Sequence, residues 1–212
     1  MRVLIFSAAV LAVCSRPTLA LAGVLIDDFS EGPITVTRTG GAYSESQTGL
    51  EASRVTGGER QFAFDQFGAE VQTATVGGGT LQLTSTPAPG GSTLVYFELM
   101  WGSDTEPLGI DLKADGGNRL HADIVAGYPP RLYLGSPGGL ESRGDFDANG
   151  DIFFADLLGS ADLSNVSWIS LATGRSLGYE IGALQVVPEP ATLVLTTAAV
   201  AGVALWRRRD RR

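Results

Sequence analysis

Apolar and polar residues alternate along short segments in the central part of the chain. In Thr-Leu-Gln-Leu-Thr at positions 80–84 both leucines fall on one face, and after Tyr179 the apolar Ile181, Ala183 and Val187 alternate with exposed positions. A period of two is typical of a half-buried β-strand, and helical periodicity is hard to find. The pattern therefore predicts β structure.

Twelve segments show this strand pattern, and Gly-, Pro- and Asp-rich turns separate them. The predicted strands are 24–29, 34–39, 60–65, 70–76, 80–85, 92–101, 108–113, 119–125, 131–134, 152–157, 166–171 and 178–187. Half-buried strands need a partner layer, so we expect an all-β antiparallel β-sandwich or jelly-roll ectodomain over residues 23–187. No fixed-period repeat is present, which argues against a solenoid or propeller.

The pattern changes at Pro188. Pro188 and Pro190 disfavour helix in the residues before them, and 16 uncharged residues follow from Ala191 to Trp206. A helix of this length spans about 24 Å, somewhat less than the roughly 30 Å hydrocarbon core, but Trp206 suits the interface and a bilayer thins locally at small cost. We therefore predict a transmembrane helix at 191–206. The alternative is an ordinary hydrophobic helix packed on a soluble domain.

An arginine cluster ends the chain. It consists of Arg207, Arg208, Arg209, Arg211 and Arg212. Positive residues beside a membrane span stay on the cytoplasmic side, so these arginines are expected to form a retained cytoplasmic stub at 207–212.

Together, Pro188-Glu189-Pro190, the apolar run and the arginine cluster resemble the PEP-CTERM protein-sorting domain, also catalogued as the ice-binding protein C-terminal domain. The resemblance covers only the tail, residues 188–212. It implies that an exosortase, a membrane-embedded transpeptidase-like enzyme of Gram-negative bacteria that make exopolysaccharide, recognises and processes the tail. The name carries no indication of ice binding for this chain.

The N-terminus has the pattern of a signal peptide at 1–22. Arg2 precedes an apolar run, and Ala20-Leu21-Ala22 offers small residues for signal peptidase, which predicts cleavage before Gly23. Leu11-Ala12-Val13-Cys14 is an imperfect lipoprotein box, because valine stands where a small residue is required. Lipidation and an uncleaved anchor are the alternatives.

Charge and cysteine content narrow the function of the exported domain. Between residues 23 and 187 there are 21 acidic and 8 basic residues, and Cys14 would leave with the signal peptide. An acidic field repels phosphate backbones, so no nucleic-acid partner is expected. Without cysteine the mature domain has no disulfide, thiolate nucleophile or Cys-ligated zinc.

A second, weaker resemblance concerns the domain itself. Ile26-Asp27-Asp28-Phe29, Gly57-Gly58-Glu59-Arg60 and the strand 177–187 before the tail look like uncharacterised jelly-roll ectodomains that precede such tails. Those domains are similar to carbohydrate-binding modules and lectin-like folds, although a fold by itself names no ligand.

The segment 145–156 carries a pattern typical of an EF-hand or dockerin-type calcium loop. Carboxylate or amide oxygens stand at loop positions 1, 3 and 5, a glycine at position 6 and a carboxylate at position 12. The candidate Ca²⁺ ligands are Asp145, Asp147, Asn149, Asp151 and Asp156. The alternative is a metal-free β-hairpin, because Ala-Asn-Gly-Asp between apolar stretches also favours a tight turn.

Aromatic residues offer a second kind of site. Tyr128 and Tyr133 flank the Pro129-Pro130 turn, and tyrosines at strand edges can stack on sugar rings. Core packing is the alternative, above all for Phe97 and Trp101 on a strand that also carries Tyr96.

No catalytic constellation is evident. The Gly-x-Ser-x-Gly at 174–178 lacks a following helix and a later histidine, since the only histidine is His121. Glu98, Asp111 and Asp123 could meet as a glycosidase-like pair, but no local motif joins them. We expect a non-enzymatic protein that is held in the inner membrane with its domain in the periplasm, and then reaches the cell surface or the medium. The alternatives are a polysaccharide-binding module for exopolysaccharide, which calcium in the 145–156 loop would stabilise, and a glycan hydrolase.

Overall fold

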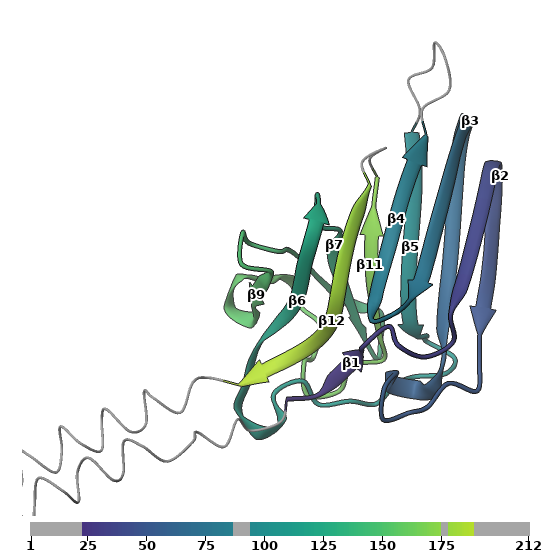
Figure 1. Ribbon diagram of the computed structural model, residues 1–212. Coiled ribbons are helices and arrows are strands. Elements are labelled where there is room, and N and C mark those ends of the chain that lie inside the picture. The colour runs from purple at the N-terminus through teal and green to yellow at the C-terminus, as the bar shows by residue number, and fades with distance from the viewer. Residues whose placement is uncertain (1–22, 87–93, 175–177, 189–212) are drawn as a thin grey trace, which may run out of the picture. The chain divides into compact units, whose positions relative to one another are not determined.

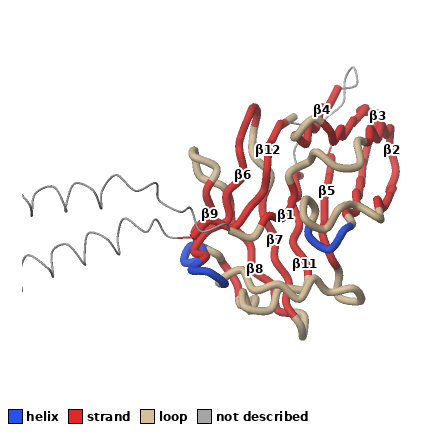
Figure 2. The backbone as a smooth tube through the Cα atoms, turned by 60° about the horizontal axis from the view of Figure 1, so that its bottom comes forward, coloured by secondary structure: helices blue, strands red, loops and turns tan. Residues whose placement is uncertain are grey.

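The computed structural model describes residues 23–86, 94–174 and 178–188, and these form strands, loops and short 3-10 turns without an α-helix (Figure 2). The strands are β1 (Leu25–Asp27), β2 (Ile34–Gln47), β3 (Arg60–Gly77), β4 (Thr80–Thr86), β5 (Leu94–Gly102), β6 (Gly117–Gly127), β7 (Arg131–Ser136), β8 (Leu140–Asp145), β9 (Asp151–Phe153), β10 (Leu158–Gly159), β11 (Trp168–Thr173) and β12 (Tyr179–Pro188). The 3-10 turns are η1 (Thr56–Gly58), η2 (Ala114–Gly116) and η3 (Phe154–Asp156). The predicted all-β class is confirmed.

Every strand pair in the described chain is antiparallel. The strand order is β10-β8-β7-β11-β5-β3-β4-β12-β6-β9, with β2 beside β3 and β1 beside β12. One edge of β3 pairs first with β5, over residues 61–67, and then with β4, over residues 71–77. Figure 1 shows the half with β4, β12 and β6 lying over the half with β5, β11 and β7.

The core lies between these two halves of the sheet. Alternate residues of β4 and β5 point into it, and Leu81, Leu83, Phe97, Leu99 and Trp101 are all buried. Burying a side chain of this size contributes about 1.5–3 kcal/mol. The prediction that both leucines of β4 share one face is confirmed, as is the core-packing alternative for Phe97 and Trp101.

Some predicted strands were wrong in extent or existence. The segments 60–65 and 70–76 belong to one strand, β3, while β8 and the second half of β2 were missed. Residues 108–113 form no strand, because only an isolated bridge joins Ile110 to Val166. Within β12 the register shifts between Ile181 and Leu184, so Leu184 and Val186 are buried and Ala183 is only half-buried.

A buried ion pair fastens the N-terminal segment to the core. Asp27 and Arg60 are both fully buried, with Nη1 of Arg60 3.3 Å from Oδ2 of Asp27. Trp101 donates its indole N–H to the same carboxylate oxygen at 2.9 Å, and the backbone N–H of Phe29 donates to Oδ1 at 2.7 Å. This contact joins two of the three segments on which the weaker resemblance rests, Ile26–Phe29 and Gly57–Arg60.

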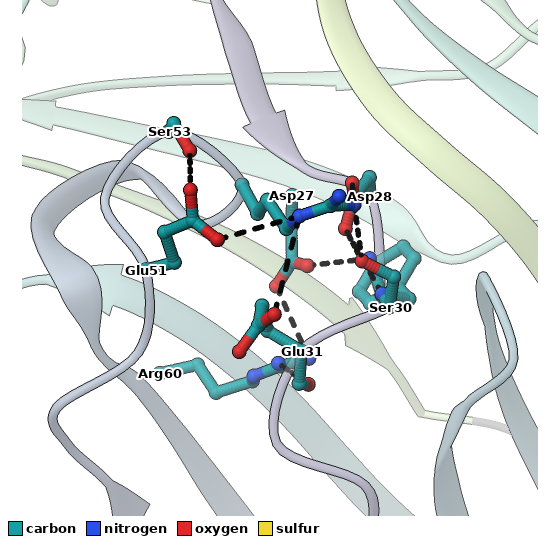
Figure 3. A network of polar contacts seen from close by, with 9 residues as sticks. Asp27, Asp28, Ser30, Glu31, Glu51, Ser53 and Arg60 are labelled. Atoms are coloured by element: carbon teal, nitrogen blue, oxygen red, sulfur yellow. Dashed lines mark hydrogen bonds and ion pairs between the residues drawn. The ribbon is translucent and has the colours of Figure 1, made fainter.

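A second, exposed layer of polar contacts surrounds this pair (Figure 3). Arg54 lies 2.9 Å from Asp28, 3.5 Å from Glu51 and 3.9 Å from Glu31, and it also donates to the hydroxyl of Ser30 at 2.9 Å. Exposed pairs of this kind contribute little individually, so their role is to order the loop between β1 and β2.

Candidate functional site

The outer face of the half-sheet β8-β7-β11-β5 carries polar side chains in register. Buried leucines and isoleucines of β7 and β11 point to the core, so the residues between them face outward. Arg131 lies opposite Asp145 on β8 and Ala172 on β11, and Ala172 lies opposite Glu98 on β5. Across β8, β7, β11 and β5 this row therefore consists of Asp145, Arg131, Ala172 and Glu98, in that order.

Three residues of this row, Asp145, Arg131 and Ala172, line a cavity of about 650 Å³, which we call the tyrosine pocket. The lining residues are Tyr96, Tyr128, Pro129, Pro130, Arg131, Tyr133, Asp145, Phe146, Ala172, Thr173 and Gly174. Its volume falls in the range of small-ligand sites, roughly 300–1,000 Å³.

Small residues on the central strand explain why the surface is hollow here. The lining residues contributed by β11 and its end include Ala172 and Gly174, whereas the neighbouring β5 and β7 contribute Tyr96 and Tyr133. Adjacent strands lie about 4.8 Å apart, so the backbones of Arg131 and Glu98 are separated by about 10 Å across Ala172. The pocket is the gap between the larger side chains.

Tyr96 lines the pocket and makes a hydrogen bond to the carboxylate of Glu98. Its hydroxyl donates to Oε2 of Glu98 at 3.0 Å, and the residue is 40% exposed. Partial burial, together with the charge of Glu98 and this hydrogen bond, raises the pKa of Tyr96 above its usual value. The phenol therefore keeps its proton, and the ring stays a neutral surface with a polar tip.

Arg131 and Asp145 form a two-point ion pair on the opposite side. Nε of Arg131 donates to Oδ1 of Asp145 at 2.7 Å, and Nη2 donates to Oδ2 at 3.0 Å. Hydrogen bonds to Asp145 and Tyr133 raise the pKa of Arg131 above its ordinary value. The parallel geometry holds the guanidinium plane in place at the pocket wall.

Such a lining suits a polyhydroxylated ligand. Tyr128 is 60% exposed and offers its ring at the pocket, while Tyr96 and Tyr133 offer further aromatic surface. The guanidinium of Arg131 supplies N–H donors and the carboxylate of Asp145 supplies acceptors, which are the partners that sugar hydroxyls require. The arrangement can therefore combine stacking with directed hydrogen bonds.

The structure brings together Tyr128 and Tyr133, the two residues that the sequence suggested for sugar stacking. It adds Tyr96, Arg131 and Ala172, none of which was assigned to a site. The alternation of Arg131 with buried Leu132 could have placed the arginine outward, but its contact with Asp145 depends on a strand that the sequence did not predict.

The candidate calcium ligands lie between the end of β8 and η3, and several make other contacts. Asp145 binds Arg131, and Oδ1 of Asp147 accepts backbone N–H groups of Asn149 and Asp151 at 2.8 and 2.9 Å. Asp156 ends η3. Among the described residues no group of three or more His, Cys, Asp or Glu is placed to hold a metal ion. The calcium loop stays a prediction of the sequence.

The hairpin alternative for this segment is wrong. β8 pairs with β7 and β10, whereas β9 pairs with β6 in the other half of the sheet. The turn after Asp147, with the N–H of Gly150 donating to the Asp147 carbonyl at 3.1 Å, therefore connects the two halves.

His121 lies outside the pocket, on β6. Its Nδ1 is 2.9 Å from Oδ1 of Asp151 and its Nε2 is 3.1 Å from Oδ1 of Asp123. His121 and Asp123 face away from the core, since Leu120 and Ala122, which alternate with them along β6, are buried. Glu98 and Asp123, two of the suggested hydrolase carboxylates, lie on β5 and β6 in different halves of the sheet.

The predicted sorting signals lie almost entirely outside the described residues. Pro188 is the last residue of β12, opposite Gly117, but Glu189, Pro190 and the segments 1–22 and 191–212 are not described. In the described part of the chain, no helix has the length and apolar character needed to cross a membrane.

Comparison with models of protein families, with curated proteins and with solved structures finds no match.

Proposed function

We propose that this protein is an exported, non-enzymatic polysaccharide-binding protein and that the tyrosine pocket is its binding site. The observation that carries the proposal is the meeting of Tyr96, Tyr128 and Tyr133 with the Arg131–Asp145 pair in one cavity. These residues come from β5, β7, β8 and the turn between β6 and β7. Surface residues that met by chance would not be expected to combine aromatic rings with an ordered pair of hydrogen-bond donor and acceptor.

The chemistry of the lining favours binding over hydrolysis. A glycosidase uses one carboxyl group as a proton donor and another as a base or nucleophile. Here Glu98 accepts a hydrogen bond from Tyr96, and both oxygens of Asp145 accept hydrogen bonds from Arg131. Carboxylates held in this way are suited to orienting hydroxyl groups.

The wider assignment joins this site to the predicted route of the chain. Two stacked half-sheets support a β-sandwich of jelly-roll type for residues 23–187. A signal peptide at 1–22 and a PEP-CTERM tail at 188–212, with its transmembrane helix at 191–206, would bring this domain through the inner membrane to an exosortase. A cell-surface or matrix location would place the pocket beside exopolysaccharide.

Affinity electrophoresis of the full chain through gels containing polysaccharide tests the proposal. We expect one or more polysaccharides to retard the wild type, and Tyr128→Ala to lose at least tenfold in affinity, because the substitution removes an exposed stacking ring. Phe153→Ala is the matched control, since Phe153 is likewise an exposed aromatic residue, at 40%, but does not line the pocket.

Equal losses in Tyr128→Ala and Phe153→Ala would show that binding occurs elsewhere. Absence of retardation across a broad panel of neutral and acidic polysaccharides would refute the proposed function. Turnover of any of these polymers would favour the hydrolase alternative.

A further inference from the structure

The charges around the tyrosine pocket indicate which kind of polysaccharide it accepts, an inference that rests on the proposed function. On the outer face of this half-sheet the acidic residues outnumber the basic ones. The acidic residues are Asp65, Glu98, Glu141 and Asp145, and the basic ones are Arg131 and Arg143. The whole segment 23–187 adds a strongly negative field, with 21 acidic and 8 basic residues.

The guanidinium at the pocket wall is already paired. Two of the five N–H donors of Arg131 are directed at the two oxygens of Asp145 in parallel. A ligand carboxylate would have to displace Asp145 to form the same two-point contact, and it would leave the displaced carboxylate beside it. Like charges at this distance disfavour the complex.

A sugar hydroxyl can bind the Arg131–Asp145 pair without displacing Asp145. Each hydroxyl both donates and accepts a hydrogen bond, and the Arg131–Asp145 pair presents remaining N–H donors next to carboxylate lone pairs. Glu98 lies outside the lining and its Oε2 accepts the hydroxyl of Tyr96, so Asp145 is the carboxylate that the pocket offers. A neutral ring can therefore form hydrogen bonds with Arg131 and Asp145 without breaking the ion pair.

We propose that the tyrosine pocket binds neutral hexopyranose units and discriminates against uronic acids. The tyrosine rings provide the stacking surface, and the paired Arg131 and Asp145 form hydrogen bonds with the hydroxyl groups. The Arg131–Asp145 pair is thus a specificity device, because Asp145 occupies the position that the carboxylate of a uronic acid would take.

The test compares binding of the full chain to neutral polymers, namely glucan, mannan and galactomannan, with binding to alginate and polygalacturonate. At low ionic strength we expect the preferred neutral polymer to bind at least tenfold more tightly than either uronate. In Asp145→Asn the affinity for uronates relative to the neutral polymer should rise at least fivefold. The guanidinium of Arg131 then loses its carboxylate partner and can bind the carboxylate of a uronate. Glu141→Gln makes the same charge change on the same strand outside the lining and should leave this ratio unchanged.

Tighter binding of a uronate by the wild type would overturn the inference while leaving polysaccharide binding itself intact. An equal change of the ratio in Asp145→Asn and Glu141→Gln would also overturn it, since general charge and not the paired arginine would then set the preference. Failure of every polymer to bind would instead remove the proposed function.

Discussion

At the scale of single residues, Asp27 is the most unusual group in the fold. Burial raises the pKa of Asp27 to about 6, although the charge of Arg60 and hydrogen bonds from Phe29 and Trp101 oppose that change. Burial likewise lowers the pKa of Arg60, so desolvation of this pair outweighs its attraction. The ion pair therefore serves to fix β1 against β3 and β5 more than to add stability.

This raised pKa predicts an unusual dependence of stability on pH. Between the unfolded value, 3.8, and the folded value, about 6, the folded chain binds more protons than the unfolded chain. The contribution of Asp27 is thus fully present below pH 4 and is lost as the pH rises through 6, a decrease on the order of 3 kcal/mol. Urea unfolding at pH 4 to 7 measures it.

Single substitutions distinguish the contribution of Asp27 to the pH dependence of stability from the contributions of other carboxylates. Asp147 has the opposite effect on the pH dependence of stability, and at lower pH, because a hydrogen bond from the backbone of Asp151 lowers its pKa. Asp27→Asn should abolish the decline between pH 4 and 6, whereas Asp28→Asn, in the exposed layer, should retain it. A wild-type stability that increases over this range would contradict the assignment.

At the scale of elements, β11 determines both the packing and the pocket on the outer face of the half-sheet β8-β7-β11-β5. Its first residue, Trp168, lies against Gly135 of β7, and an added Cβ at Gly135 would be 2.1 Å from the indole ring. Its last part, with Ala172, leaves the space that becomes the pocket. One strand thus has a large side chain at one end and small ones at the other.

Gly135→Ala should therefore destabilise the protein by about 1–3 kcal/mol, because the indole ring of Trp168 must move in a packed surface. The midpoint of denaturant unfolding is the measurement. Gly174→Ala is the control, since a Cβ there meets no atom within 4 Å, and it should leave the midpoint nearly unchanged. Equal midpoints for the two variants would disprove the packing argument.

At the scale of the whole molecule, charge is divided along the sequence. The segment 23–187 is acidic, and five arginines follow the apolar run at the C-terminus. This division agrees with a domain outside the inner membrane and a basic stub in the cytoplasm. The predicted span of 16 residues is short, which suits temporary retention beside a processing enzyme.

Mass spectrometry of the mature protein from an exosortase-bearing Gram-negative host checks this route. We expect the wild type to lack the arginine cluster, because processing at the sorting motif removes it. Glu189→Ala should retain the cluster, whereas Glu180→Gln in β12 should be processed normally. A mature wild-type protein that still ends at Arg212 would contradict the proposed route.

The sequence by itself determined the local features of this domain. Alternation in segments such as Thr80–Thr84 was sufficient to predict strands and the buried face of β4. It also located Tyr128 and Tyr133 at the edge of a turn. These properties depend on neighbours within a few residues, and a period of two records them directly.

Only the tertiary structure decided which strands meet and in which register. The shift near Gly182 buries Leu184 and Val186 where simple alternation favoured Ala183 and Val187. Pairing of β7 with β8 turned Asp145 toward Arg131, and β11 between β7 and β5 created the pocket. Register depends on bulges and on partners distant in the chain, and a one-residue slip reverses the face of a side chain. For that reason the sequence was sufficient for most of the strands, but not for the strand pairing that forms the tyrosine pocket.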